Sequence, residues 1–136
     1  MSERPVVVTG VVSGVALVLE EPLSLWGGLD PATGTIVDRH HPQVGQSVTG
    51  KVLVLPSGRG SSGGSSVLAE TVRAGVGPAA VILAVPDPIL MVGGVVLAEL
   101  YPDRAIPIVV ADLSTFEGLR SGGLVSIDER GRISAP

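Results

Sequence analysis

A run of glycine and serine residues at positions 56–66 holds the residue types best suited to chemistry. It follows the apolar segment 52–55, contains Arg59, and precedes a segment with helical spacing. A buried strand that continues through such a loop into a helix directs several backbone N–H groups and the positive helix end toward one point. This arrangement binds anions, and the same N–H groups can stabilise the alkoxide of a serine. We therefore expect an anion site that includes a serine hydroxyl.

The same loop also allows a purely structural interpretation. In that case Ser65 or Ser66 caps the helix and the glycines form a flexible connector. A nucleotide-binding P-loop does not fit, because no Gly-Lys-Ser or Gly-Lys-Thr follows the glycines. We favour a ligand site, because α/β folds bind ligands where core strands end and because a connector has little need of the arginine at position 59.

The only tryptophan stands beside a pair of glycines in segment 21–30. One interpretation places Trp26 over the open end of a barrel, as part of the core. The other places Trp26, Gly27, Gly28 and Asp30 in a loop that faces a partner or a ligand. The sequence leaves both interpretations open.

Other polar residues give weaker signals. His40 and His41 are adjacent, and adjacent residues of an extended segment point to opposite sides, so we do not expect them to bind one metal ion. Asp38 is the only carboxylate close to them. Asp87 precedes Pro88 and is expected to cap a helix. For these reasons we expect no metal on this chain. The sequence also carries no signature of a Ser-His-Asp or Cys-His active site, so we expect no autonomous hydrolase activity.

The composition describes the domain that must hold these residues. The chain has 136 residues, 45% of them hydrophobic and 2% aromatic, and no cysteine. Its core must therefore consist of Val, Leu, Ile and Ala side chains. Disulfides and thiolate-bound metal or iron–sulfur centres are excluded for this chain alone. The length predicts a single domain over residues 1–136, with a core from about 5 to 128.

Charge and hydropathy exclude two classes of partner. Nine basic and thirteen acidic residues give a formal net charge of −4, which does not suit a nucleic-acid-binding protein. The longest apolar run, residues 79–85, is far shorter than a membrane span of roughly 18 residues. The N-terminal residues lack the basic start and leucine stretch of a signal peptide, so we expect a cytoplasmic protein.

The first half of the chain has the composition of strands. Short β-branched runs separated by glycine predict strands at 6–8, 11–12, 15–19, 36–37 and 52–55. The sequence Asp30-Pro31-Ala32-Thr33-Gly34 predicts a turn that reverses the chain before Ile36. We expect these strands to form a small curved sheet or barrel.

The second half alternates between helix and strand. The patterns predict a helix at about 67–75, a strand at 79–85, a helix from Asp87 to about Leu100, a strand at 106–110, a helical turn at about 112–119 and a strand at 124–127. This order suggests parallel strands with helical crossovers. The fold class is therefore α/β, a β/β/α domain with an N-terminal curved sheet or barrel followed by β-α-β units.

Several spaced residues together resemble a known family. They are Ala16-Leu17-Val18-Leu19, Glu21-Pro22-Leu23-Ser24, Trp26-Gly27-Gly28, Asp30-Pro31, Thr33-Gly34, Ile36, Asp38, His41-Pro42-Gln43, Gly45, residues 50–56, Arg59-Gly60-Ser61, residues 79–82 and Pro88-Ile89-Leu90. The pattern resembles the small, swivelling subunit of the aconitase X family, and the likeness covers about residues 10–127.

The resemblance implies a swivelling β/β/α domain that forms part of a hydro-lyase. Its partner would be a large aconitase X catalytic subunit, in a heterodimer or larger assembly, which holds the iron or iron–sulfur centre through cysteines. In the wider aconitase superfamily a Gly-x-Gly-Ser-Ser loop supplies the general base as its first serine. Gly58-Arg59-Gly60-Ser61-Ser62 matches this loop, and Ser61 falls at the position of the base. The resemblance thus implies substrate contacts around Ser61, at Arg59, Gly60, Ser62, Gly63, Gly64 and Ser65.

The resemblance also bears on the substrate. The family dehydrates cis-3-hydroxy-L-proline in bacteria and 5-phosphomevalonate in archaea. Ordinary aconitases have an arginine after the two serines that binds a substrate carboxylate, whereas this chain has Gly63 and Gly64, so we do not expect a tricarboxylate. Arginine supplies eight of the nine basic residues and Lys51 is the only lysine, which favours a bacterial source. We therefore expect cis-3-hydroxy-L-proline, with 5-phosphomevalonate as the alternative.

Two functions of other classes are alternatives to the hydro-lyase subunit. A non-catalytic domain that binds a phosphorylated metabolite would use the same anion-binding loop. A phosphohistidine carrier shares the swivelling architecture, but it would need a histidine beside the glycine-rich loop, and neither His40 nor His41 lies there.

Overall fold

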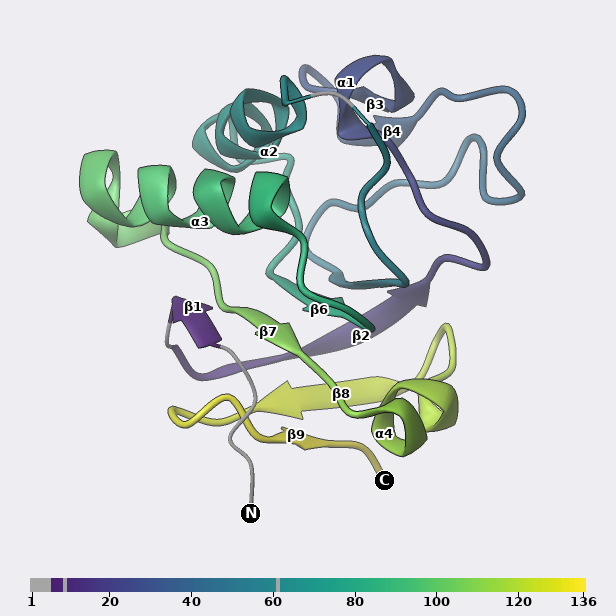
Figure 1. Cartoon of the computed structure of the whole chain (residues 1–136), viewed down its shortest axis with the longest axis vertical. Coiled ribbons are helices and arrows are strands. Elements are labelled where there is room, and N and C mark those ends of the chain that lie inside the picture. Colours follow the sequence, from purple (N-terminus) through teal and green to yellow (C-terminus); the bar gives the residue numbers. More distant parts are fainter. Residues whose placement is uncertain (1–5, 9, 61) are drawn as a thin grey trace.

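The computed structural model describes residues 6–8, 10–60 and 62–136. Within these residues seven strands form one sheet in the order β1-β7-β6-β5-β2-β8-β9 (Figure 1). The strands are β1 (Val6–Val8), β2 (Val12–Val18), β5 (Val52–Leu55), β6 (Ala80–Leu83), β7 (Ile108–Val110), β8 (Leu124–Ile127) and β9 (Ile133–Ser134), and a separate hairpin pairs β3 (Leu29–Asp30) with β4 (Thr35–Ile36). The helices are α1 (Leu25–Gly28), α2 (Gly64–Arg73), α3 (Pro88–Leu100), the 3-10 helix η1 (Pro102–Arg104) and α4 (Leu113–Gly118). None of these described helices is long and apolar enough to cross a membrane.

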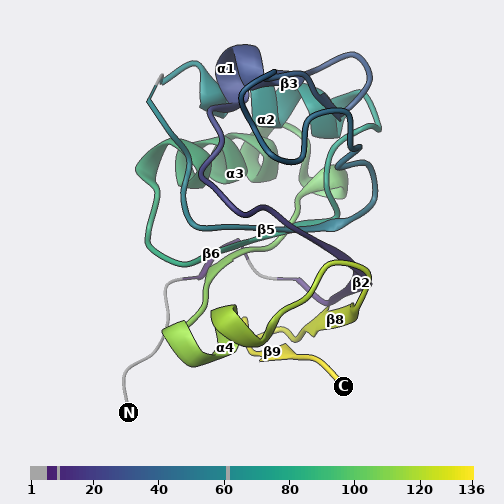
Figure 2. The same cartoon turned by 90° about the vertical axis from the view of Figure 1, so that its right-hand side faces the viewer.

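The centre of the sheet is parallel. Strands β2, β5, β6 and β7 run in the same direction. They also lie side by side in the sheet in the order in which they occur along the chain. Crossovers that step in one direction along a parallel sheet lie on one face, because they share the right-handed sense. Figures 1 and 2 show this result, with α1, α2 and α3 above the central parallel strands and α4, β8 and β9 below them.

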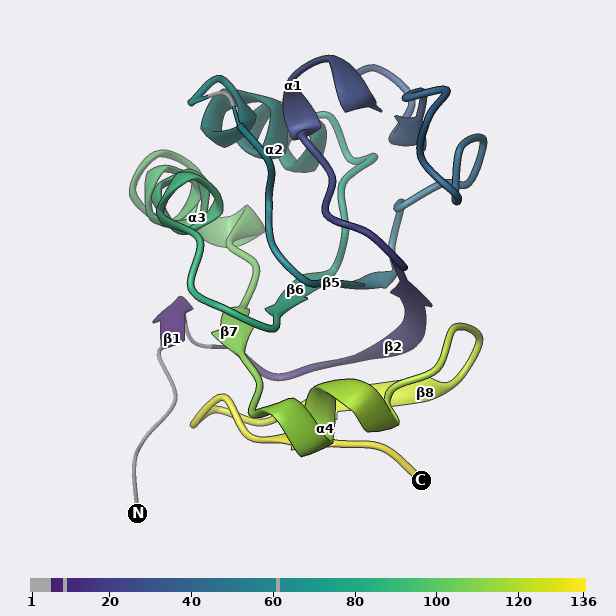
Figure 3. The ribbon, with the colours of Figure 1, turned by 45° about the vertical axis from the view of Figure 1, so that its right-hand side comes forward.

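The long strand β2 makes the sheet curl. Its second half, from Ala16 to Val18, pairs in parallel with β5, while its first half, from Val12 to Val15, pairs antiparallel with β8. The sheet therefore bends around β2, so that β8 and β9 fold beneath the central strands (Figure 3).

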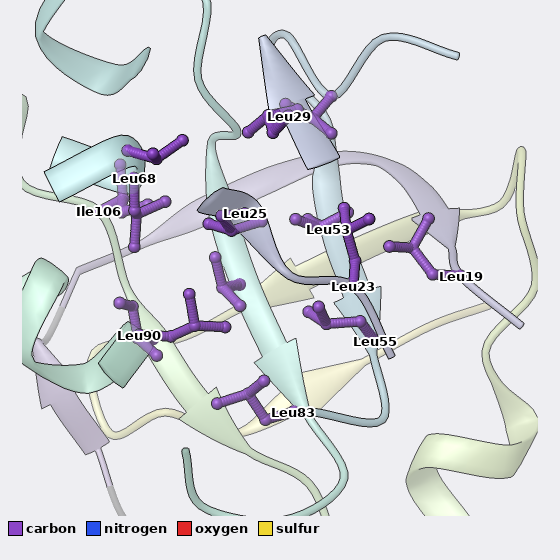
Figure 4. Packing of buried hydrophobic residues seen from close by; sticks show 14 of the residues in the cluster. Leu19, Leu23, Leu25, Leu29, Leu53, Leu55, Leu68, Leu83, Leu90 and Ile106 are labelled. Atoms are coloured by element: carbon purple, nitrogen blue, oxygen red, sulfur yellow. The ribbon is translucent and has the colours of Figure 1, made fainter. Parts of the chain in front are cut away.

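Alternate residues of the strands face two apolar clusters, as the period of two requires. One row of neighbouring residues, Leu17, Leu53, Val81 and Ile108, belongs to the cluster beneath the helices. The next row, which includes Val54, faces the cluster covered by α4 and β8. Leu68, Leu90 and Ile106 join the first cluster from the helix side, as Figure 4 shows. With so few aromatic residues, the core consists almost wholly of aliphatic side chains, as predicted from the composition.

The α/β class with its β-α-β units is confirmed, and so are most of the predicted elements. Asp87 caps α3, since its side chain accepts hydrogen bonds from the Ile89 and Leu90 N–H groups at 3.0 and 3.1 Å. Strands β5 and β8 begin and end at the predicted residues. The turn before Ile36 is confirmed as well, because β3 and β4 form an antiparallel pair around it.

One expectation about the elements was wrong. The last predicted strand, β8, is antiparallel to its neighbour β2, so the final connection through α4 is not a parallel crossover. After β8 the chain adds a further strand, β9, which pairs with β8. The curved sheet is confirmed, but both halves of the chain share it, since β2 and β5 lie inside the common sheet and β1 pairs with β7. Apolar patterns identify a strand but not its neighbour or its direction.

Candidate functional site

The segments that follow three of the strands begin at the same edge of the sheet. Because β2, β5 and β6 are parallel neighbours, their carboxyl ends lie side by side. The chain leaves β2 toward Trp26, leaves β5 into the glycine–serine loop, and leaves β6 toward Asp87. This edge is where open α/β sheets bind ligands, and it unites the two stretches that the sequence marks as candidate sites.

Backbone contacts hold the first part of the glycine–serine loop. The Ala84 and Val85 N–H groups donate to the Pro56 carbonyl oxygen at 3.2 and 3.3 Å. Gly58 forms a parallel bridge with Leu23, from the segment that leaves β2. The Gly58 N–H also donates to Asp87 Oδ2 at 2.6 Å. The loop is thus fixed on both sides just before its central residues.

The central residues of the loop lie at the surface. Arg59, Gly60 and Ser62 are exposed, and Gly60 has a positive φ of 79°. Gly63 is half-buried and Gly64, the first residue of α2, is buried. Ser61, the predicted general base, lies outside the described residues, so its role stays a prediction.

The structural interpretation of the serines that follow was wrong. Gly63, not Ser65 or Ser66, is the N-cap residue of α2. The Ser65 hydroxyl donates to the Ile89 carbonyl oxygen at 2.6 Å and joins the first turns of α2 and α3. The Ser66 hydroxyl donates to the Gly63 carbonyl oxygen at 2.9 Å. The Ser65 N–H donates to the Ser62 carbonyl oxygen at 3.3 Å, so both donors of Ser65 have partners in the chain.

The Trp26 segment lies beside this loop. Leu23 and Leu25 are buried against the central strands (Figure 4), and a Cβ atom on Gly64 would lie 3.8 Å from the Leu25 Cβ atom. Trp26 itself is 61% exposed. The interpretation in which Trp26 closes a barrel as part of the core is therefore wrong, and a surface role remains.

Two further predicted residues shape this segment. Gly27 has a positive φ of 79°, which breaks α1 into an irregular turn, whereas Gly28 is buried. Asp30 Oδ1 accepts a hydrogen bond from the Ala32 N–H at 2.9 Å and stabilises the turn after β3. Gly27 therefore shares the surface with Trp26, and Asp30 supports the loop from within the hairpin.

His41 is a supporting residue whose role the sequence did not reveal. It is 3% exposed, its Nδ1 atom accepts a hydrogen bond from the Gln43 N–H at 3.1 Å, and its Nε2 atom lies 3.1 Å from the Glu21 carbonyl oxygen. Since Nδ1 is an acceptor, Nε2 carries the proton and donates to Glu21. The Gln43 side-chain oxygen accepts from the Glu20 N–H at 3.1 Å. Together these contacts fix the chain just before the Trp26 segment.

We expect the His41→Ala variant to lower the free energy of unfolding by about 2 kcal/mol, because it removes two hydrogen bonds and leaves the buried Gln43 N–H without its acceptor. Urea unfolding followed by circular dichroism measures the change. His40→Ala is the matched control, because His40 is exposed and only its backbone N–H is held, by Asp38. Equal stability of the two variants would contradict the role assigned to His41.

The described residues of this chain do not fit a metal or iron–sulfur centre. The sequence has no cysteine. Within the residues that the structure describes, no three His, Cys, Asp or Glu side chains gather where a metal ion could bind. His41 uses both ring nitrogens for backbone contacts. No catalytic step is therefore assigned to a metal held by this chain.

Comparison with known proteins agrees with the fold. Residues 1–135 match the family model of the aconitase X swivel domain. The chain is 46% identical over 101 residues to the cis-3-hydroxy-L-proline dehydratase of Pseudomonas aeruginosa, a match that covers 74% of this chain and 17% of that protein. It is 47% identical over 122 residues to the phosphomevalonate dehydratase small subunit of Methanopyrus kandleri, covering 85% of this chain and 87% of that subunit.

Solved structures give the same result. The crystal structure of Thermococcus kodakaraensis aconitase X in its holo-form superposes with a TM-score of 0.86 at 30% identity, covering 98% of this chain and 96% of that one. The present chain spans only 17% and 20% of the hydroxyproline dehydratases from Pseudomonas aeruginosa and Hypocrea jecorina. The resemblance first indicated by the spaced Trp, His, Pro and Gly residues is confirmed: the chain belongs to the aconitase X swivel domain family.

Proposed function

We propose that this chain is the swivelling subunit of an aconitase X type hydro-lyase and that Ser61 is its general base. The observation that carries the proposal is the position of Gly58, Arg59, Gly60 and Ser62, the described residues on either side of Ser61 in the sequence, at the carboxyl edge of the parallel strands. There the loop lies beside the exposed Trp26 and the first turn of α2. Relatives with the same domain are named dehydratases.

Dehydration next to a carboxylate requires a base for a weakly acidic C–H bond. In the proposed reaction the Ser61 oxygen accepts that proton, the C–H electron pair becomes part of the new double bond, and the hydroxyl group on the neighbouring carbon leaves. In this proposal, backbone N–H groups of the exposed loop residues Gly60 and Ser62, close to the start of α2, stabilise the alkoxide and anionic substrate groups. Because the donors of Ser65 already have partners, its part is to hold this arrangement in place.

The proposal includes a second polypeptide or domain. The matched region is a fifth or less of the hydroxyproline dehydratases, and other relatives are named small subunits. We propose that a large subunit supplies the rest of the pocket, including the iron or iron–sulfur centre, and that it covers the surface around Trp26 and Gly27. Exposed tryptophan is common at the centre of protein interfaces. Arg59 gives the loop a cation for the substrate or for this partner.

We propose cis-3-hydroxy-L-proline as the substrate, with 5-phosphomevalonate as the second candidate. Relatives named for each activity are 46–47% identical to this chain, so the identity does not separate them. Gly63 and Gly64 leave the loop without the arginine that binds a further carboxylate in ordinary aconitases. A small acid held by backbone N–H groups suits this loop.

The test is to express the chain with and without the large aconitase X subunit from the same genome and to assay both compounds. We expect no turnover by the chain alone and turnover of one compound by the pair. A chain that binds a phosphorylated metabolite alone in calorimetry, and yields no dehydratase activity with the partner, would instead be a non-catalytic binding domain.

A further inference from the structure

Asp87 makes more contacts than a helix cap requires. Its side chain is buried, with 8% exposed. Oδ1 accepts from the Ile89 and Leu90 N–H groups, as a cap does, and Oδ2 accepts from the Gly58 N–H at 2.6 Å. Asp87 makes no ion pair with any described residue. One buried carboxylate therefore holds both the start of α3 and the loop that carries the predicted base.

The contact at Gly58 is a close fit. A Cβ atom on Gly58 would lie 2.5 Å from Asp87 Oδ2, so a side chain at position 58 would push the loop and the carboxylate apart. Gly58 has no positive φ, so backbone conformation does not explain the glycine here. The close approach of the carboxylate does explain it. Position 58 also lies only three residues before Ser61.

A second helix of the same chain shows what a cap without this contact looks like. Asp112 precedes α4, and its Oδ1 atom accepts from the Thr115 N–H at 2.8 Å and the Ser114 hydroxyl at 3.3 Å. α4 covers the opposite face of the sheet from α2 and α3 (Figure 2). Asp112 therefore caps its helix without a contact to Gly58, whereas Asp87 makes that contact.

We propose that Asp87 is a positioning residue, which sets the place of the base loop through the Gly58 N–H. This inference rests on the proposed function, because it gives Asp87 a role in the reaction for which Ser61 is the proposed base. Asp87 does not touch the reacting atoms. It acts on the geometry of the loop, and a displacement of a catalytic group by about 1 Å can cost about 100-fold in rate.

The Asp87→Asn variant separates the two contacts. Asparagine caps helices as well as aspartate does, so its oxygen can keep the Ile89 and Leu90 N–H groups. Its NH₂ group then takes the place of Oδ2. Because this group is a hydrogen-bond donor, it cannot accept the hydrogen bond from the Gly58 N–H. In the assembled two-subunit enzyme we expect kcat to fall about 10- to 100-fold with little change in KM. Asp112→Asn is the matched control and should keep the kcat of the wild type.

Two further measurements complete the test. Hydrogen exchange in the assembled enzyme should show faster exchange of the Gly58 amide in Asp87→Asn and not in Asp112→Asn. Asp87→Ser keeps a capping oxygen and lacks a second polar atom, so it should show the same loss of kcat. This variant replaces Asp87→Asn in the test if Asp87→Asn does not fold. Equal kcat and equal exchange in the Asp87 and Asp112 variants would overturn the proposal.

Different measurements test the positioning role of Asp87 and the proposed role of Ser61 as the base. If Ser61 is the base, Asp87→Asn should cause little further loss in a Ser61→Ala background, because residues that act as a unit are not additive. If Ser61→Ala alone retains its activity, the assignment of the base is wrong. Faster exchange at Gly58 with an unchanged kcat would show that Asp87 holds the loop without serving the reaction, which contradicts the positioning role.

Discussion

The Ser61→Ala variant is expected to lower kcat of the assembled enzyme by about two to four orders of magnitude, the usual contribution of a positioned general base. The loop keeps its contacts at Pro56 and Gly58, which involve backbone atoms and Asp87 and not the serine side chain. We therefore expect the variant to assemble normally with the large subunit. Steady-state kinetics and size-exclusion chromatography measure the two properties in parallel.

The neighbouring serines supply the controls. Ser66 is exposed and its hydroxyl donates to the Gly63 carbonyl oxygen, so Ser66→Ala should retain a kcat close to that of the wild type. Ser62 is exposed in the same loop and is the next candidate for the base. Near-normal turnover by Ser61→Ala, together with a large loss in Ser62→Ala, would move the catalytic role by one residue.

Local signals account for what the sequence predicted well. Asp87 followed by Pro88 fixes the start of α3 because both residues act within one helical turn. Residues 30–34 fix the turn between β3 and β4 in the same way. The bounds of β5 could be predicted because a fully apolar run ends where the glycine–serine loop begins. In each case the interacting groups lie within a few residues of one another.

The missing parts of the site are contacts between distant residues. The hydrogen bond from Gly58 to Asp87 spans 29 positions, and the bridge between Leu23 and Gly58 joins two separate loops. Backbone N–H groups take part in each, and they leave no trace in a pattern of residue types. The burial of His41 was equally hidden, because the pair lies on a turn in which the His41 N–H donates to the Asp38 carbonyl oxygen, and either histidine could have faced inward.

We expect a large effect at Gly34, outside the glycine–serine loop, because its contacts also join residues that are distant in the sequence. Gly34 is buried, has a φ of 73°, and is the last residue of the turn that joins β3 to β4. A Cβ atom there would lie directly against the Val76 carbonyl oxygen and 2.6 Å from Thr49 Oγ1. Thr49 and Val76 are themselves joined, because the Thr49 hydroxyl donates to that carbonyl oxygen at 2.9 Å. The added methyl group therefore meets a fixed backbone and not the end of a flexible side chain.

We expect Gly34→Ala to lower the free energy of unfolding by about 2–5 kcal/mol, of which the positive φ accounts for about 1–2 kcal/mol and the steric overlap for the rest. Urea unfolding of the chain measures the change. Gly50→Ala is the matched control, because Gly50 has a similar φ of 69° but no atom within 4 Å of the added Cβ, so it should show only the cost of the backbone conformation. Equal losses in the two variants would mean that the hairpin does not pack on residue 76. The hydrogen bond from the Val37 N–H, just after β4, to the Gly28 carbonyl oxygen would then be the contact that joins the hairpin to the Trp26 segment.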